Sequence, residues 1–255
     1  MLLIYAGITC ALPIKFIPTC ESRNWSLGLQ RSAPVDSRRP MKVEGSYSDS
    51  GFAHIQGLVP VEVTDAFLRR LKQDLGLASV DLSKVTQHPN LLKRPAFEVY
   101  GRQYPPMLQF LWGLTPIVSQ LVGHELLPTY DYFRIYREGD VCMVHSDRLA
   151  CEHSLSLTLD YSDGAPWDLE VGTQRTEPSA RVTEDFGADP HAAITMEVGD
   201  AVLYQGVHHR HGRMTPNPNG WSAHLFLHWV DRDGPYRDQA LEGETSRAKA
   251  DFHFA

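Results

Sequence analysis

Residues 130–161, YDYFRIYREGDVCMVHSDRLACEHSLSLTLDY, decide the fold class of this chain. Three short runs rich in aromatic and β-branched residues, at 130–136, 141–145 and 154–161, are separated by turn-forming and polar segments. Such runs, bounded by turn signals, predict short β-strands. Further runs of the same kind follow at 193–198, 201–206 and 222–230. The C-terminal half of the chain is therefore predicted to form a β-sandwich or barrel.

Two helices are expected before this strand-rich region. Residues 61–75 carry apolar side chains at helical spacing, including Phe67, Leu71 and Leu75. Residues 105–127 show a second apolar-periodic pattern that contains Pro116, so we expect either one kinked helix or two short ones. Residues 51–60 indicate a short strand and a turn. The polar, proline-containing stretch 172–192 is long for a loop of a compact domain, which favours a functional or disordered segment.

Composition restricts the classes of partner. The 255 residues carry a net charge of −7, which does not resemble the basic surface of a duplex-binding module. The apolar stretch at residues 1–20 is interrupted by two prolines and is too short to span a membrane. We therefore expect neither nucleic acid nor a membrane as a partner. The sequence does not indicate an oligomeric state.

The N-terminal residues differ from the rest of the chain. Residues 1–40 contain five basic and only two acidic side chains, and Met41 offers an alternative start. We predict that residues 1–45 are a disordered or non-native extension and that residues 46–255 form one catalytic domain. A cytoplasmic location is expected, and the arginine- and serine-rich run before Pro40 leaves organelle targeting as the alternative.

Four cysteines occur, at positions 10, 20, 142 and 151, without any CxxC pair. A thiolate zinc site and a disulfide framework are therefore both unfavoured. Cys142 and Cys151 are predicted to be small buried apolar residues in a protein of a reducing compartment.

A metal site is indicated by two separate motifs. His145 and Asp147 end one predicted strand, and residues i and i+2 of a strand point to the same face. The segment LYQGVHHRHGR, residues 203–213, then places His208, His209 and His211 directly after another predicted strand. Two imidazoles with one carboxylate form the facial triad typical of non-heme iron(II) oxygenases. The residues alone leave the choice among the three later histidines open.

Three segments carry a family resemblance: YFRIYREGDVCMVHSDRLACEHSLSLTLDY (132–161), EVGDAVLYQGVHHRHGR (197–213) and WSAHLFLHWV (221–230). In the order and spacing of these elements, residues 51–232 resemble the iron(II)/2-oxoglutarate-dependent dioxygenases, in particular their prolyl-hydroxylase-like branch. The resemblance implies a double-stranded β-helix of the jelly-roll or cupin-like type with supporting N-terminal helices. It also implies Fe(II), with 2-oxoglutarate and O₂ as cosubstrates.

Carried over by position, the resemblance makes His145 and Asp147 the first two metal ligands. His211 is the third, because relatives often place this ligand five residues after a strand-ending glycine, here Gly206. His208 and His209 stay as alternatives. The activity implied is hydroxylation of an unactivated C–H bond in a small-molecule or amino-acid-like substrate. The carboxylate at Asp147 favours oxygen insertion over halogenation, because halogenases of this family lack it.

The chain departs from the family at the group that binds the far carboxylate of 2-oxoglutarate. An arginine or lysine is usual about ten residues after the last ligand, but Trp221 stands there. We consider Arg213, or Ser222 together with His224, with Tyr136 assisting. Of these, Arg213 offers a bidentate partner for a carboxylate. His224 would bind it as a cation only when protonated, so affinity would then fall as pH rises.

Arg134 and Arg148 are further candidates, for contact with the substrate. Two other functions fit the same sequence. One is a cupin-type metal enzyme that does not use 2-oxoglutarate, although such enzymes more often have H-x-H in place of H-x-D. The other is a non-catalytic jelly-roll binding protein, which the complete triad disfavours.

Overall fold

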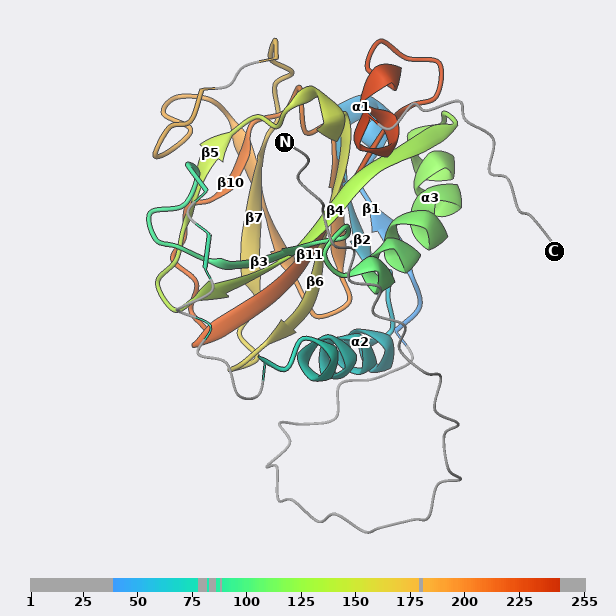
Figure 1. Cartoon of the computed structure of the whole chain (residues 1–255). Coiled ribbons are helices and arrows are strands. Elements are labelled where there is room, and N and C mark those ends of the chain that lie inside the picture. Colours follow the sequence, from blue (N-terminus) through green and yellow to red (C-terminus); the bar gives the residue numbers. More distant parts are fainter. Residues whose placement is uncertain (1–38, 78–81, 83–85, 88, 179–180, 244–255) are drawn as a thin grey trace, which may run out of the picture. The chain divides into compact units, whose positions relative to one another are not determined.

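Two antiparallel β-sheets face one another in the computed structural model of the chain (Figure 1). The larger sheet has the strand order β1-β2-β9-β6-β11-β4-β3 and the smaller one the order β5-β10-β7-β8. The structure describes residues 39–77, 82, 86–87, 89–178 and 181–243. The strands are β1 Lys42–Glu44, β2 Phe52–Gln56, β3 Phe97–Tyr100, β4 Leu126–Arg137, β5 Cys142–His145, β6 His153–Tyr161, β7 Trp167–Gly172, β8 His191–Met196, β9 Ala201–Tyr204, β10 His211–Arg213 and β11 Trp221–Asp231.

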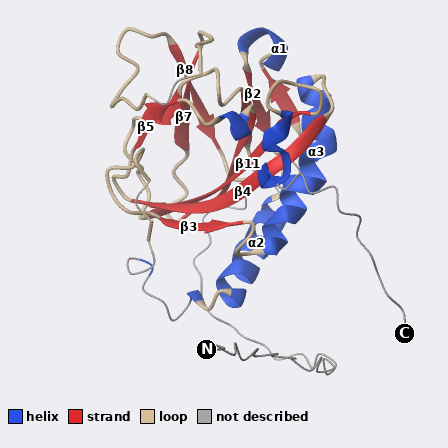
Figure 2. Ribbon diagram, turned by 45° about the horizontal axis from the view of Figure 1, so that its top comes forward, coloured by secondary structure: helices blue, strands red, loops and turns tan. Residues whose placement is uncertain are grey.

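The chain crosses repeatedly between the two sheets. From β4 onward, β4, β6, β9 and β11 lie in the larger sheet, whereas β5, β7, β8 and β10 lie in the smaller one. Figure 2 shows β5, β7 and β8 on one side of the molecule and β3, β4 and β11 on the other. This alternation is the double-stranded β-helix, so the predicted fold class is confirmed.

Helices pack against the outer face of the larger sheet, namely α1 Tyr47–Ser50, α2 Val61–Asp74 and α3 Leu108–Val122, with the 3₁₀ turn η3 Pro105–Met107 leading into α3. Two further 3₁₀ turns are η4 Leu149–Cys151 and η5 Arg237–Gly243, which pack against each other. Residues such as Leu71 of α2 and Leu111 of α3 share one apolar core with Leu157 of β6 and Leu225 of β11. Burial of this apolar surface is the main term that stabilises the sheet against the helices.

The second predicted helix is shorter than its apolar pattern. It begins as a 3₁₀ turn, continues through Pro116, and ends at Val122 because Gly123 adopts a left-handed backbone with φ of 86°. Glycine tolerates this conformation, which terminates the helix. Residues from Leu126 onward, predicted as its last turn, instead open strand β4.

The inner face of the larger sheet carries polar side chains among aromatic ones such as Phe226. Strand residues alternate between two faces, and in β11 the leucines at 225 and 227 join the helix-side core, whereas His224 and His228 point to the smaller sheet. Each of these two leucines and two histidines is at most 2% exposed. Polar side chains are costly to bury without partners, so this interior is built to hold polar groups.

The described strands include residues that the sequence analysis placed in the N-terminal extension. Residues 42–44, placed in the extension, form β1 and pair with β2, whereas residues 1–38 lie outside the described residues. Strands β3 and β7 were not predicted either. Among the described residues, no helix is long and apolar enough to cross a membrane.

Candidate metal centre

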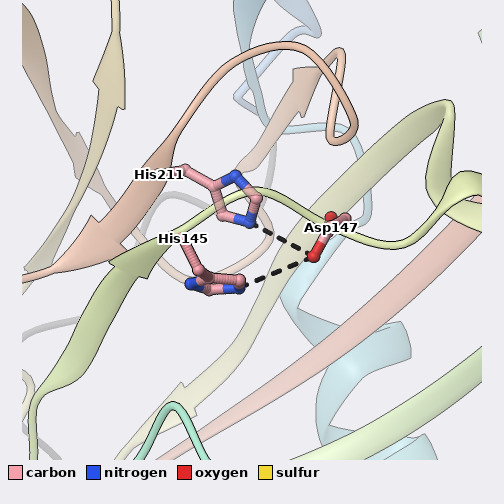
Figure 3. Close-up of side chains that lie close together, drawn as sticks. All are labelled: His145, Asp147 and His211. Carbon is pink, nitrogen blue, oxygen red and sulfur yellow. Dashed lines mark ion pairs between the residues drawn. The ribbon is translucent and has the colours of Figure 1, made fainter. Parts of the chain in front are cut away.

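His145, Asp147 and His211 come together at one end of the smaller sheet (Figure 3). His145 ends β5 and His211 begins β10, and the two are cross-strand partners in this sheet. Nε2 of His145 and Nε2 of His211 each lie 3.5 Å from Oδ1 of Asp147. The two rings lie 4.4 Å apart between centroids. Three donor atoms therefore converge from one side, as a facial triad requires.

Both imidazoles have a fixed orientation. Nδ1 of His145 lies 2.7 Å from the carbonyl oxygen of Met143, and Nδ1 of His211 lies 2.9 Å from that of His209. A carbonyl only accepts a hydrogen bond, so each Nδ1 carries the proton. Each Nε2 is then left with its lone pair directed at the triad. Metal-ligating histidines are usually oriented by this kind of outer hydrogen bond.

Asp147 is held in place by hydrogen bonds of its backbone N–H and of Oδ2, the carboxylate oxygen that does not face the two imidazoles. Its N–H donates to the carbonyl of Gly206 at 2.8 Å, and Ser154 Oγ donates to its Oδ2 at 3.0 Å. A Cβ atom at position 206 would lie only 2.4 Å from Oδ2 of Asp147. Glycine is therefore required at position 206 by the close approach of the carboxylate.

The triad is electrostatically coupled. Burial alone would raise the pKa of Asp147, but the neighbouring imidazoles, His211 above all, hold the pKa of this carboxyl well below its ordinary value. Burial and then the nearby His211 lower the pKa of His145. Asp147 is thus ionised and His145 neutral at physiological pH, which are the states that bind a divalent metal.

His208 and His209 point elsewhere. Nδ1 of His208 lies 3.1 Å from the carbonyl of Thr176, and Nδ1 of His209 lies 2.8 Å from that of Gly172. The ring of His209 also fills the space that a side chain at Gly51 would need. Of the three later histidines, the structure brings only His211 within 4.8 Å of the other two triad members.

An outer chain of hydrogen bonds continues from Asp147. Ser154 Oγ, which donates to Asp147, lies 2.9 Å from Nδ1 of His228. With the serine proton directed at the carboxylate, His228 donates from Nδ1 and its Nε2 becomes an acceptor. That buried Nε2 has no hydrogen-bond partner among the described residues. Burial, with the charges of Arg148 and His211, lowers the pKa of His228 to about 4.

A second polar group lies deeper between the sheets. Nη2 of Arg213 on β10 lies 3.5 Å from Nδ1 of His224 on β11. The centroid of the Tyr136 ring lies 5.7 Å from that of the His224 ring. Ser222 is the cross-strand partner of Tyr136 in the larger sheet. The structure therefore brings together all four residues, Tyr136, Arg213, Ser222 and His224, that the sequence proposed for the cosubstrate.

This inner group has unsatisfied polar atoms. Arg213 is 1% exposed, and its Nη1 donates to the carbonyls of Trp167 and Asp168. No carboxylate lies within 4.0 Å of its guanidinium in the part of the chain that the structure describes. Nε2 of His224 and Oγ of Ser222 are buried without a partner among those residues. A buried cation beside unused donors fits an anionic ligand.

The charge state of His224 differs from the protonated, cationic form that the sequence analysis considered as a partner for a carboxylate. Burial, followed by the charges of Arg213 and Arg134, lowers the pKa of His224 well below its ordinary value. His224 is therefore neutral at physiological pH. Because Arg213 can only donate, the nearby Nδ1 is an acceptor and the proton sits on Nε2. His224 thus offers a neutral N–H donor rather than a positive charge.

Neither a protein-family model nor a curated protein sequence matches the chain. Solved structures do. The non-heme α-ketoglutarate-dependent carbocyclase SnoK from nogalamycin biosynthesis is 13% identical, with a TM-score of 0.58 over 80% of this chain and 88% of that one. The epimerase SnoN, in complex with Fe³⁺, α-ketoglutarate and nogalamycin RO, is 13% identical, with a TM-score of 0.56 over 80% and 89%.

A third similar structure is HygX from Streptomyces hygroscopicus with nickel, 2-oxoglutarate and hygromycin B bound. It is 12% identical, with a TM-score of 0.53 over 73% of this chain and 85% of that one. The chain has the fold of the iron/2-oxoglutarate-dependent oxygenases. The expected oxygenase fold is confirmed, whereas the prolyl-hydroxylase-like branch within it stays a prediction.

Sequence reasoning missed part of the surroundings of this candidate metal centre. Ser154, seven residues further along the chain, and Gly206, from a distant segment, both contact Asp147, and no sequence motif marks either residue. His228 had a weak signal, because it stands on the polar face of an otherwise apolar strand. Arg134, a candidate substrate contact, is instead engaged by Glu98 in a buried ion pair of 2.6 Å.

Proposed function

We propose that the protein is an Fe(II)- and 2-oxoglutarate-dependent oxygenase that hydroxylates an unactivated C–H bond of a small-molecule or amino-acid-like substrate. The observation that carries the proposal is the triad of His145, Asp147 and His211. Their donor atoms converge within 4.8 Å, and both imidazoles have Nδ1 engaged by a carbonyl. Two imidazoles and a carboxylate suit iron(II) and leave coordination positions for a keto acid and O₂.

The inner group supports 2-oxoglutarate as the cosubstrate. Arg213 supplies a buried positive charge with no carboxylate within 4.0 Å among the described residues, and His224 adds a neutral N–H donor. A dicarboxylate could use one end at the metal and the other at this group. The similar structures of SnoN, in complex with α-ketoglutarate, and of HygX, with 2-oxoglutarate bound, agree with this assignment.

The residues of the chain would have distinct roles in the reaction. Bound iron together with 2-oxoglutarate supplies an oxidant from O₂, with succinate and CO₂ as by-products. His145, Asp147 and His211 would hold the metal, and Ser154 would keep the Asp147 carboxylate in place. Arg213 would orient the keto acid. The largely buried side chains around the triad would limit the access of bulk water to the reaction.

The test is anaerobic addition of Fe(II) and then 2-oxoglutarate to the metal-free protein. We expect one equivalent of bound iron and a weak visible charge-transfer band that appears only when both are present. Asp147→Ala and His145→Ala should each abolish the iron and the band. His191→Ala, which removes an exposed imidazole on β8, is the control and should keep both.

Two results separate the alternatives. If iron binds without a band, the cupin-type enzyme that does not use 2-oxoglutarate gains support. If the protein binds no more iron than the Asp147→Ala variant, the oxygenase proposal fails. The product mass identifies the reaction: hydroxylation adds one oxygen atom, whereas an epimerisation or a ring closure does not.

A further inference from the structure

A separate cavity of about 490 Å³ adjoins the metal centre. It lies at the end of β3, beside η4 and η5, and its walls include Tyr100, Arg102, Gln103, Tyr130, Arg148 and Gln239. The 3₁₀ turn η5 closes one side by packing against β4 and η4. Cavities of a few hundred cubic ångströms typically hold small-molecule ligands.

The cavity shares a wall with the candidate metal centre. Arg148 directly follows the triad member Asp147 in the chain. The Tyr130 ring stacks on His228 at 4.6 Å, and its hydroxyl lies 3.1 Å from Sγ of Cys151. Donor atoms of Cys151 and His228 in turn lie within 4.8 Å of Asp147. On this side, Tyr130 and then Cys151 or His228 stand between the cavity and the triad member Asp147.

Two arginines of the cavity are oriented without a carboxylate partner. The guanidinium of Arg148 lies 4.1 Å from the centroid of the Tyr130 ring, and its Nε donates to the Tyr130 hydroxyl at 3.3 Å. That of Arg102 lies 5.6 Å from the Tyr100 ring. Among the described residues, neither has a carboxylate within 4.0 Å, whereas Arg94 and Arg210, for example, do.

This arrangement favours a ligand with an anionic oxygen group. A guanidinium that is stacked on an aromatic ring keeps its planar N–H groups free for a carboxylate or a phosphate. Because stacking already fixes its orientation, less entropy is lost when the anion binds. Asp238 is the one acidic residue among those that line the cavity, so the two arginines leave an excess of positive charge.

We propose that this cavity binds the substrate through a carboxylate or phosphate group held by Arg148, with Arg102 assisting. Naming the ligand a substrate rests on the proposed oxygenase function, whereas binding of the anion does not. Neutral molecules of the same shape are poor ligands.

The test uses the full chain without metal or 2-oxoglutarate, and calorimetry with three matched probes. These are 4-hydroxyphenylacetate, its neutral primary amide, and phenyl phosphate. We expect at least one anion to bind at least about tenfold more tightly than the amide, a factor that corresponds to about 1.4 kcal/mol. The tighter of the two anions distinguishes a carboxylate from a phosphate ligand.

Variants of Arg148 test whether the anion binds in this cavity. Arg148→Gln should weaken anion binding at least about tenfold, and Arg148→Lys should weaken it less, since the charge stays but the planar fork is lost. Arg69→Gln, which removes an exposed arginine of α2, is the control and should bind like the parent. Equal binding of acid and amide overturns the proposal, as does the absence of anion binding up to about 10 mM.

Two further outcomes keep this proposal separate from the oxygenase assignment. Anion binding that survives Arg148→Gln but is lost in Arg213→Gln places the anion in the inner group and overturns the inference. Binding that depends on Arg148, in a protein that shows no iron or 2-oxoglutarate binding, refutes the proposed function while the anion-binding cavity stands.

Discussion

Arg213 and His224 meet between the two sheets, with Nη2 of the arginine 3.5 Å from Nδ1 of the histidine. This contact joins a permanent cation to an imidazole that is neutral because burial and the charges of Arg213 and Arg134 lower its pKa. The positive charge available to an inner ligand therefore belongs to Arg213. His224 contributes the N–H of Nε2, which has no partner among the described residues.

Arg213→Gln should accordingly raise the dissociation constant of 2-oxoglutarate at least about tenfold, because it removes the buried charge. The loss should be similar at all pH values between about 6 and 9, since arginine does not titrate there. This dissociation constant is measured by titrating 2-oxoglutarate and following the charge-transfer band. Arg210→Gln, three residues away and paired with exposed Asp189, should leave the affinity unchanged. An equal loss in both variants would argue against an inner anchor.

Ser154→Ala should weaken metal binding about tenfold to a hundredfold, as removal of outer-shell partners generally does. The hydroxyl donates to Asp147 Oδ2 and links it to His228. Iron affinity measured by competition with a chelator tests this prediction. Ser156→Ala is the matched control, because Ser156 stands two residues further on the same strand and its buried hydroxyl has no partner among the described residues. If both serines behave alike, Ser154 has no specific role.

The lowered pKa of His228 predicts that the metal-free protein loses folding stability in mild acid. Its pKa is lowered from 6.5 to about 4, mainly by burial, with Arg148 and His211 lowering it further and Asp147 opposing them. As pH falls below 6.5, the unfolded chain takes up this proton first, so stability is lost down to about pH 4. The loss from this residue is at most about 3 kcal/mol.

Urea unfolding of the parent and of His228→Asn between pH 7 and pH 4.5 measures this contribution. Asparagine keeps an N–H near the position of Nδ1 but does not titrate. The variant should therefore lose less stability than the parent over this interval. His191→Asn, at an exposed imidazole, should follow the parent. The prediction fails if the pH dependence of His228→Asn equals that of the parent.

A chain that begins at Met41 should fold and keep its stability within about 1 kcal/mol. Among the described residues it loses Arg39 and Pro40; Nη1 of Arg39 lies 3.3 Å from Oδ1 of Asp200, and the Arg39 side chain is 41% exposed. Partly exposed ion pairs contribute little, and Asp200 keeps bonds to the backbone of Gly57 and to His54. Thermal unfolding and solubility test this. Aggregation, or a much lower melting temperature, would show that residues before Met41 stabilise the domain.

Local patterns in the sequence determined the class of fold and the ligand types. Alternating and β-branched runs specify strands because side chains of a strand alternate between two faces, and the i, i+2 spacing placed His145 and Asp147 on one face. The same alternation indicated that Ser222, His224 and His228 share a polar face. These are short-range properties, which depend only on backbone geometry.

Only the tertiary structure decided which distant groups meet. His211 rather than His208 or His209 lies in the triad because the pairing of β10 with β5 sets the register opposite His145. Arg213 reaches His224 across two sheets, Ser154 reaches Asp147, and Gly206 leaves room for that carboxylate. The cavity at Arg148 likewise combines β3, η4 and η5. Such contacts depend on sheet register and on the packing of different strands and turns against one another, which leave no local signature in the sequence.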